Sequence, residues 1–198
     1  MSPVHNPMQN LLPFDGIVRY FGRVIDPTNA AAYLEMLKTN LDWQQEETII
    51  FGKRHISKRL VAWYGDESYE YRYSGSIKLA LPWTKDLAAL KSIAEKISGT
   101  IYNSCLVNLY HNGNEGMGWH SDNEKSIVPD SSIASISLGA ERRFVFKHRT
   151  LSEKVEIFLQ DGSILEMKGE TQRYWLHSLP KSKRVTMPRI NLTFRKMI

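Results

Sequence analysis

The chain has 198 residues, of which 42% are hydrophobic and 24% charged, so it is long enough for one globular domain with a sizeable core. Its formal net charge of +5 permits a polyanionic partner without requiring one. No apolar run is long enough to span a bilayer, no secretory signal is visible, and the single cysteine, Cys105, excludes an internal disulfide. We therefore expect an intracellular protein that binds no membrane, in the cytoplasm of a bacterium or the nucleus of a eukaryote.

The N-terminal part predicts an arm followed by two helices. Residues 1–13 are expected to form a loose arm. Asp26-Pro27 is a typical helix start, with Asp as the N-cap and Pro at the first position, and this helix is expected to run through Ala30–Lys38. A second helix is expected over about 84–98, where an apolar stripe at helical spacing is followed directly by a glycine. The stripe consists of Leu87, Leu90, Ile93, Ala94 and Ile97.

From about residue 100 onward the pattern changes to short β-rich segments separated by turn residues. A run of strands that follows two helices predicts a mainly β (α+β) fold, either a β-sandwich or a jelly-roll barrel buttressed by N-terminal helices. The expected strands are 103–110, 132–139, 143–148, 154–160, 162–168, 172–178 and 189–197.

Basic residues gather in three groups along the chain. Each group alone is most simply a solvated face, but three groups in a chain of this size favour a surface that contacts phosphates. The groups are Lys53, Arg54, Lys58 and Arg59; Arg142, Arg143, Lys147 and Arg149; and Lys181, Lys183 and Arg184.

One face of the last expected strand is entirely polar, whereas its other face is apolar. A polar face is common where an edge strand meets solvent. It also fits the inside of a barrel mouth, where a guanidinium can bind a carboxylate through two parallel hydrogen bonds. The polar face consists of Arg189, Asn191, Thr193 and Arg195.

The strand over 103–110 carries a second polar pair that would suit the same small anion. Asn108 and Tyr110 share one face by period-2 alternation, opposite Val107 and Leu109. Leu106 falls on the polar face, so the alternation is imperfect.

The stretch GWHSDNE, which follows a glycine-rich run, offers two metal ligands at a spacing of two residues, His120 and Asp122. A third candidate, His177, lies in an apolar and aromatic segment where a lone histidine is usually a satisfied core residue. Two histidines and one carboxylate form the facial triad that leaves open coordination positions on Fe(II). Structural zinc sites instead prefer four closed ligands rich in cysteine, which this chain lacks.

The order Asn-x-Tyr, His-x-Asp, His and Arg-x-Asn-x-Thr-x-Arg resembles the AlkB family of Fe(II)/2-oxoglutarate-dependent dioxygenases, and is most similar to its nucleic-acid-repair branch, in particular the enzymes that demethylate double-stranded DNA. The resemblance covers about residues 49–197 and is carried by NLYHNGNEGMGWHSDNE, SIASISLGAERRFVFKHR, WLHSLP and PRINLTFRK. It implies one dioxygenase domain over 1–198, with the arm at 1–13, helices and a nucleotide-recognition lid at about 14–100, and a double-stranded β-helix (jelly-roll) catalytic core at about 101–198.

The resemblance also implies the chemistry. Proteins of this branch use Fe(II), 2-oxoglutarate and O2 to oxidise the N-methyl group of 1-methyladenine or 3-methylcytosine in DNA, and they release succinate, CO2 and formaldehyde. Arg189 or Arg195 would pair with the distal carboxylate of 2-oxoglutarate. The implied iron ligands are His120, Asp122 and His177, and the implied 2-oxoglutarate residues are Asn108, Tyr110, Arg189, Asn191, Thr193 and Arg195.

A base-handling lid is implied by two further segments. The segment IIFGK at 49–53 is similar to the family's finger hairpin, whose phenylalanine wedges into the base stack, and YEYRYSG at 69–75 is similar to the lid over the flipped base. Without the resemblance, the first reads as an ordinary hairpin tip and the second as a half-buried strand. Close eukaryotic relatives have a second acidic residue at position 123. The implied substrate-binding residues are Phe51, Gly52, Lys53, Tyr71, Arg72, Tyr73, Ser74, Asn123 and Glu124.

Two other functions stay open from the sequence. The same oxygenase chemistry could act on RNA or on a protein side chain, and a β-domain with a vestigial pocket could bind nucleic acid without catalysis. The expected partner is alkylated DNA, single- or double-stranded, and we expect a monomer.

Overall fold

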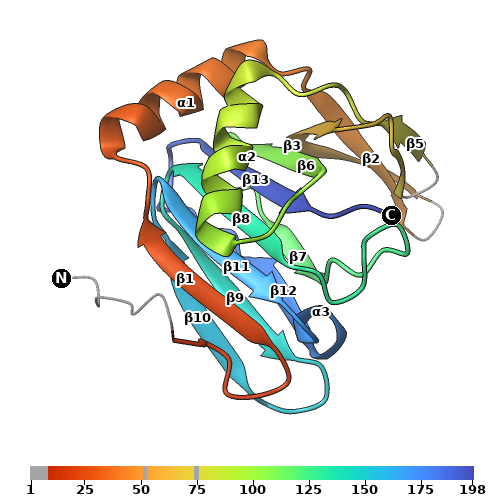
Figure 1. Ribbon diagram of the computed structural model, residues 1–198, viewed down its shortest axis with the longest axis vertical. Coiled ribbons are helices and arrows are strands. Elements are labelled where there is room, and N and C mark those ends of the chain that lie inside the picture. The colour runs from red at the N-terminus through yellow and green to blue at the C-terminus, as the bar shows by residue number, and fades with distance from the viewer. Residues whose placement is uncertain (1–8, 51–52, 74–75) are drawn as a thin grey trace.

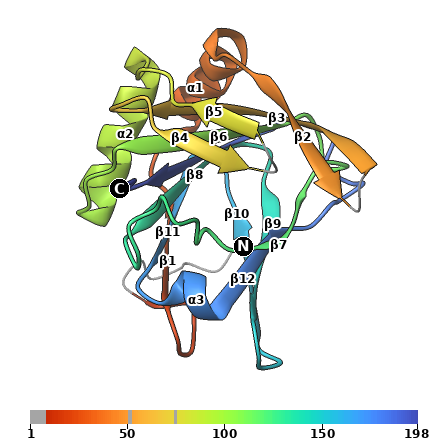
Figure 2. The ribbon, with the colours of Figure 1, turned by 90° about the vertical axis from the view of Figure 1, so that its right-hand side faces the viewer.

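A computed structural model of the protein describes residues 9–50, 53–73 and 76–198. Over these residues the chain forms three layers, in which two helices cover one face of a large antiparallel sheet and a smaller antiparallel sheet packs on its other face (Figures 1 and 2). The large sheet has the order β1 (Ile17–Arg23), β11 (Ser163–Lys168), β8 (Ile133–Gly139), β13 (Arg189–Arg195), β6 (Ser104–Tyr110), β3 (Lys53–Gly65) and β2 (Gln44–Ile50).

The small sheet closes the barrel, and a separate two-stranded hairpin belongs to neither sheet. The expected mainly β, jelly-roll architecture with N-terminal helices is confirmed. The small sheet has the order β10 (Lys154–Leu159), β9 (Arg142–His148), β12 (Trp175–Leu179) and β7 (Met117–His120), and the hairpin consists of β4 (Glu70–Tyr73) and β5 (Ser76–Leu79).

Both expected helices form, with the expected ends. Helix α1 (Pro27–Asn40) begins at Asp26, whose side chain accepts a hydrogen bond from the backbone N of Asn29 at 3.1 Å. Helix α2 (Lys85–Ser98) ends at Gly99, which has the left-handed φ of 67° that glycine tolerates best. Within the described residues, no helix has the length and apolar content that a membrane crossing requires.

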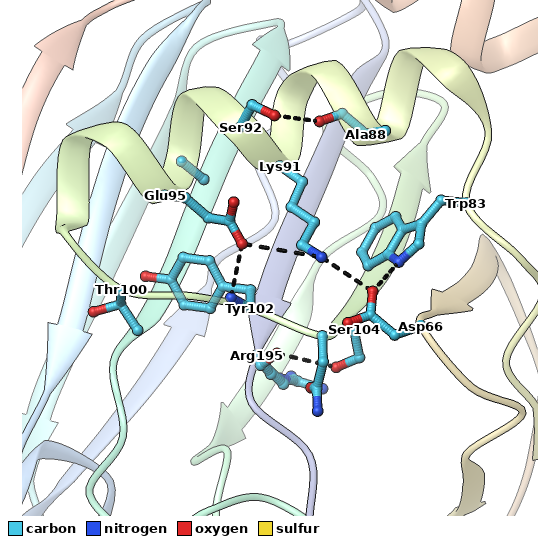
Figure 3. A network of polar contacts seen from close by, with 12 residues as sticks. Asp66, Trp83, Ala88, Lys91, Ser92, Glu95, Thr100, Tyr102, Ser104 and Arg195 are labelled. Atoms are coloured by element: carbon cyan, nitrogen blue, oxygen red, sulfur yellow. Dashed lines mark hydrogen bonds and ion pairs between the residues drawn. The ribbon is translucent and has the colours of Figure 1, made fainter.

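Helix α2 is fixed to the large sheet mainly by apolar burial. Leu87, Leu90 and Ala94 of its stripe are fully buried in a core cluster shared with β6, β8 and β13. Burying one leucine side chain contributes about 1.5–3 kcal/mol. At its edge, Lys91 contacts Asp66 at 3.0 Å (Figure 3), but a partly exposed ion pair of this kind contributes at most about 1 kcal/mol.

The period-2 pattern of the three central strands separates two environments. On the helix side, Leu109, Ile136, Leu192 and their neighbours belong to the core cluster under the helices. On the opposite side, β13 presents its four polar residues, and it is flanked by β8 and β6 rather than by solvent. The solvent-facing edge strand is therefore excluded, because the polar face of β13 lies inside the barrel.

The structure differs from the sequence expectations in four places. The N-terminal part contributes β1, β2 and β3 to the large sheet in addition to the helices. The expected strand over 172–178 begins only at Trp175, and a short helix α3 (Thr171–Tyr174) precedes it. Strand β7 was not expected. Leu12, in the segment expected to be a loose arm, is 3% exposed in a core cluster with β1, so the end of that segment is packed.

Candidate metal centre and adjoining pocket

The two candidate histidines are held opposite each other by the small sheet. His120 ends β7, His177 lies on β12, and the two residues pair directly across the ladder. Their ring centroids are 4.3 Å apart. Asp122 follows β7 by two residues, and one ligand atom from each of the three side chains lies within 4.8 Å of the others. The sequence-predicted triad is thus brought together, and it lies inside the barrel.

A β-bulge in β7 aims His120 into the barrel. His120 pairs with His177 and Met117 pairs with Leu179, so three steps along β7 match two steps along β12. One extra residue in a strand reverses the alternation beyond it, and bulges of this kind often re-aim a side chain beside a site. Met117 and His120 consequently both line the same cavity.

The hydrogen bond of His120 and the pKa values of His177 and Asp122 suit a set of metal ligands. The Nδ1 of His120 lies 2.9 Å from the carbonyl oxygen of Gly118, and since a carbonyl only accepts, Nδ1 donates this bond and Nε2 is the nitrogen left for a metal. Burial lowers the pKa of His177 to about 3, so this imidazole is neutral. Burial alone would raise the pKa of Asp122, but the charge and the hydrogen bond of Arg195 lower it to about 2.

Two further observations fit a bound ion. The buried Nδ1 of His177 has no hydrogen-bond partner among the described residues, so this side chain is not held as a satisfied core histidine. Two imidazole nitrogens and one carboxylate match the donor set of Fe(II) sites that keep open positions. Among the described residues, no other cluster of metal-ligating side chains is present.

Contacts to both the side chain and the backbone fix the position of Asp122. Inside the barrel, Arg195 Nη2 lies 2.8 Å from Asp122 Oδ1. On the outer side, Gln172 of α3 accepts a hydrogen bond from the backbone N–H of Asp122 at 2.9 Å, and Arg149 donates to Ser121 Oγ at 2.6 Å. Three elements distant in sequence therefore set the position of this carboxylate.

A cavity of about 130 Å³ adjoins the triad, and it opens between the two sheets. Its lining includes every residue that was expected to hold a small anionic ligand. These residues are Asn108, Tyr110, Arg189, Asn191, Thr193 and Arg195.

The polar face of β13 forms a hydrogen-bonded ladder. Arg189 Nη2 donates to Asn191 Oδ1 at 2.7 Å and to Ser137 Oγ at 2.8 Å. Asn191 Nδ2 in turn donates to Thr193 Oγ1 at 2.8 Å. Because Ser135 Oγ also donates to Asn191 Oδ1 at 3.0 Å, the Asn191 amide is occupied at both ends and serves to hold its neighbours.

The two arginines of β13 lie at different ends of the cavity. Arg195 is paired with Asp122 and therefore lies at the metal end. Arg189 is 2% exposed, its Nε has no hydrogen-bond partner, and none of the described carboxylates lies within ion-pair distance of it. Burial lowers the pKa of Arg189 to about 10, so the guanidinium is still charged at neutral pH. Of the two arginines, Arg189 is the one placed to hold a carboxylate remote from the metal.

Arg59 is a site residue that the sequence reasoning missed. It was assigned to a basic surface group, but it is 5% exposed, lines the cavity and donates to Asn108 Oδ1 at 2.6 Å. A signal was present, because Arg59 shares its face of β3 with the buried residues Val61 and Trp63, whereas Lys58 is exposed. Ser135, Met117 and other cavity-lining residues carried no such signal.

The second basic group is likewise not one surface. Arg142 is 2% exposed and donates to the carbonyl oxygens of Glu115 and Pro180 at 2.8 and 3.0 Å, so its expected exposure is wrong. Arg143 pairs with Glu156. Lys147 is exposed, as are the three basic residues of the third group, Lys181, Lys183 and Arg184.

The expected substrate-binding residues are described only in part. Glu124 lines the cavity beside the triad, whereas the exposed Asn123 lines only a neighbouring cavity of about 280 Å³, to which Glu124 also contributes. Lys53 is the first residue of β3, and Tyr71, Arg72 and Tyr73 lie in β4. Phe51, Gly52 and Ser74 lie outside the described residues.

Comparisons with known proteins agree with this site. The sequence model of the 2OG-Fe(II) oxygenase superfamily matches residues 17–195. DNA oxidative demethylase ALKBH2 from Mus musculus is 40% identical over 157 residues, which cover 75% of this chain and 66% of that protein. Alpha-ketoglutarate-dependent dioxygenase alkB homolog 3 from Homo sapiens is 36% identical over 180 residues, which cover 86% of this chain and 63% of that protein.

A solved structure of OsALKBH1 supports the fold, with a TM-score of 0.61 and 16% identity over 93% of this chain and 99% of that one. The chain spans slightly less than two thirds of the two curated relatives, at 66% and 63% of their lengths. The family match nevertheless includes the triad, the cavity and the polar face of β13. The chain therefore belongs to the AlkB family within the 2OG-Fe(II) oxygenase superfamily, whose cofactors are Fe(II) and 2-oxoglutarate, with O2 as co-substrate.

Proposed function

We propose that the protein is an Fe(II)- and 2-oxoglutarate-dependent oxidative demethylase that repairs N-alkylated bases in DNA, with 1-methyladenine and 3-methylcytosine as its substrate class. The observation that carries the proposal is one cavity, lined at one end by a 2-His-1-carboxylate triad and at the other by buried Arg189, which has no carboxylate within ion-pair distance among the described residues. The relative named DNA oxidative demethylase supports DNA as the substrate, and the relative named alpha-ketoglutarate-dependent dioxygenase supports the co-substrate.

Residues at different positions along the cavity would bind the metal and the co-substrate. His120, Asp122 and His177 would hold iron. Arg189 would bind the distal carboxylate of 2-oxoglutarate, and Tyr110, whose ring centroid lies 5.6 Å from the Arg189 guanidinium, would assist it. Arg195 keeps Asp122 ionised, which is the form that binds a metal. With iron, 2-oxoglutarate and O2 bound, the centre supplies the oxidation of an N-methyl group, with succinate and CO2 as co-products. The hydroxymethylated base then loses formaldehyde.

The substrate end follows from the same geometry. Glu124 lines the cavity beside the triad and would contact the exocyclic group of a base extruded from the helix. Residues 49–53 would form the finger, with Phe51 as the wedge, and residues 69–75 would form the lid over the flipped base. Exposed Lys147, together with Lys181, Lys183 and Arg184, would contact phosphates. Because its substrate would be DNA, the protein would act in a bacterial cytoplasm or a eukaryotic nucleus. We further propose that it is a monomer and that the chain forms one dioxygenase domain.

Formaldehyde release from an oligonucleotide that contains 3-methylcytosine tests the proposal. The wild-type protein with Fe(II) and 2-oxoglutarate should release formaldehyde, and His120→Ala should abolish the release. His111→Ala is the matched control, because the side chain of His111 is 48% exposed and pairs with Glu115 outside the triad. Full activity of His120→Ala would contradict the metal assignment. No visible charge-transfer band on anaerobic addition of Fe(II) and 2-oxoglutarate would favour a non-catalytic nucleic-acid-binding domain instead.

A side-by-side panel decides the substrate. Methylated double-stranded DNA, single-stranded DNA and RNA should be compared at equal lesion concentration. If Phe51 acts as a wedge, Phe51→Ala should reduce turnover on duplex DNA more than on single strands. Equal losses would remove the wedge, and preference for RNA would move the same chemistry to a different polymer.

A further inference from the structure

Arg59 is a buried cation in the cavity to which the AlkB motifs assign no role. It lies on β3, at the base of the hairpin that β2 and β3 form, and is 5% exposed. Its Nη1 donates to Asn108 Oδ1 at 2.6 Å and lies 3.9 Å from the sulfur of Met117. Both partners also line the cavity. Arg59 therefore joins the strand of the proposed finger to two walls of the pocket.

The short contact determines which way the Asn108 amide faces. A guanidinium has only donors, so the atom of Asn108 beside Arg59 must be the acceptor Oδ1. The amide nitrogen of Asn108 then points away from Arg59 and is left as a donor. This is the orientation that a carboxylate ligand requires, because a carboxylate only accepts. A hydrogen bond from a charged donor is roughly twice as strong as one between neutral groups, so it holds this small side chain in one orientation.

We propose that Arg59 is a positioning residue for 2-oxoglutarate, which it serves by presenting the Asn108 amide nitrogen to the co-substrate. The inference rests on the proposed function, since it concerns the co-substrate of that reaction. Arg189 would pair with the distal carboxylate directly, whereas Arg59 acts through Asn108. Without Arg59, the Asn108 amide is free to rotate and can present its oxygen to the carboxylate.

A double-mutant cycle on 2-oxoglutarate affinity tests the proposal. The variants are Arg59→Met, Asn108→Ala and the combination, and the affinity is measured by anaerobic titration of the Fe(II)-loaded protein, followed by its visible absorption. Arg59→Met should weaken 2-oxoglutarate binding by about tenfold, which corresponds to about 1.4 kcal/mol. In the Asn108→Ala background, the same change should alter the affinity by less than about twofold, because two residues that act through one contact are not additive.

Controls separate this role from net charge and from folding. Lys58→Met removes one positive charge from the exposed face of the same strand and should leave the affinity unchanged. In steady-state assays, Arg59→Met should raise the KM for 2-oxoglutarate while the KM for the oligonucleotide and kcat at saturating co-substrate stay within about twofold, a split that a general loss of packing would not produce. If Arg59→Met does not fold, Arg59→Lys enters the same cycle, because it keeps the charge and one donor.

Two results would overturn the inference. One is an unchanged 2-oxoglutarate affinity in Arg59→Met. The other is an equally large penalty in the Asn108→Ala background, because Arg59 would then contact 2-oxoglutarate itself. Failure of the wild-type protein to bind 2-oxoglutarate with Fe(II) would instead contradict the proposed function, so the two failures are distinguishable.

Discussion

Removing the buried charge of Arg189 should affect ligand binding far more than folding. Arg189 is 2% exposed and donates to two neutral oxygens, those of Ser137 and Asn191. A buried cation without a counter-ion is normally unfavourable, and replacing buried charges with apolar residues of similar volume is often neutral or stabilising. We therefore choose Arg189→Met as the perturbation.

The magnitude follows from the pKa. Burial lowers the pKa of Arg189 from its ordinary 12.5 to about 10, and one pKa unit corresponds to about 1.4 kcal/mol. Because the folded-state pKa is the lower one, the charged form destabilises the fold by roughly 3 kcal/mol at pH 7. This cost begins to fall only as the pH rises through about 10. The methionine variant removes the cost but also removes the charged donor of Ser137 Oγ and Asn191 Oδ1, at about 1–3 kcal/mol. The two effects nearly cancel.

Urea unfolding of the metal-free protein measures the first half of this prediction. Arg189→Met should unfold within about 2 kcal/mol of the wild type, although truncating a large buried side chain usually costs more, about 2–5 kcal/mol. Under anaerobic conditions, adding 2-oxoglutarate at about 100 times the wild-type Kd should stabilise the wild type by about 2.7 kcal/mol relative to the protein with Fe(II) alone, and the variant by almost nothing. Arg173→Met, whose side chain is 55% exposed, is the control. A variant destabilised by more than about 4 kcal/mol, or stabilised by 2-oxoglutarate like the wild type, would refute the reasoning.

Three further outcomes are expected. Gln172→Ala should weaken Fe(II) affinity in anaerobic titration by about tenfold with little change in Tm, because it releases the backbone N–H of Asp122. Unchanged affinity would show that Arg195 alone holds the Asp122 carboxylate in place. Glu166→Gln should lower the free energy of urea unfolding by about 1–3 kcal/mol. The Glu166 carboxylate is 1% exposed, lies 3.4 Å from Lys168 Nζ and accepts a hydrogen bond from the buried Ser132 hydroxyl. Gly113→Ala should lower the free energy of unfolding by about 1–3 kcal/mol, since its Cβ would meet backbone of the 180–187 loop, whereas Gly118→Ala, with open space around its Cβ, should have little effect.

The features that the sequence predicted best are those with a local physical cause. The start of α1 at Asp26 and the end of α2 at Gly99 depend on capping groups beside the helix ends. The polar face of Arg189–Arg195 depends on strand alternation, which holds because both faces of the central strand β13 are buried and differ in polarity. Each signal is complete within a few residues, so no knowledge of the fold was needed.

The features that were missed depend on contacts between distant segments. Residues 172–174 read as a strand because of their aromatic neighbours, yet Thr171 is fully buried and bonds to Ile17 and Lys168, which fixes a turn of helix there instead. The burial of Arg59 likewise depends on β3 lying beside β6, a pairing that only the folded sheet reveals. The exposure of Asn123 depends on the path of the loop that follows Asp122.

The glycine-rich run before the His-x-Asp pair has a structural reason that connects sequence to chemistry. A Cβ at Gly113 would meet the carbonyl oxygen of Ser182, and a Cβ at Gly116 would meet that of Leu179. The absence of side chains lets this loop lie directly on the 179–185 segment, where Gly113 N donates to the carbonyl oxygen of Val185 at 2.8 Å. The same approach brings β7 onto β12, and with the bulge it sets His120 opposite His177. The glycines therefore act on the metal centre through strand pairing, and any larger residue at Gly116 should separate the two histidines before it disturbs the helices.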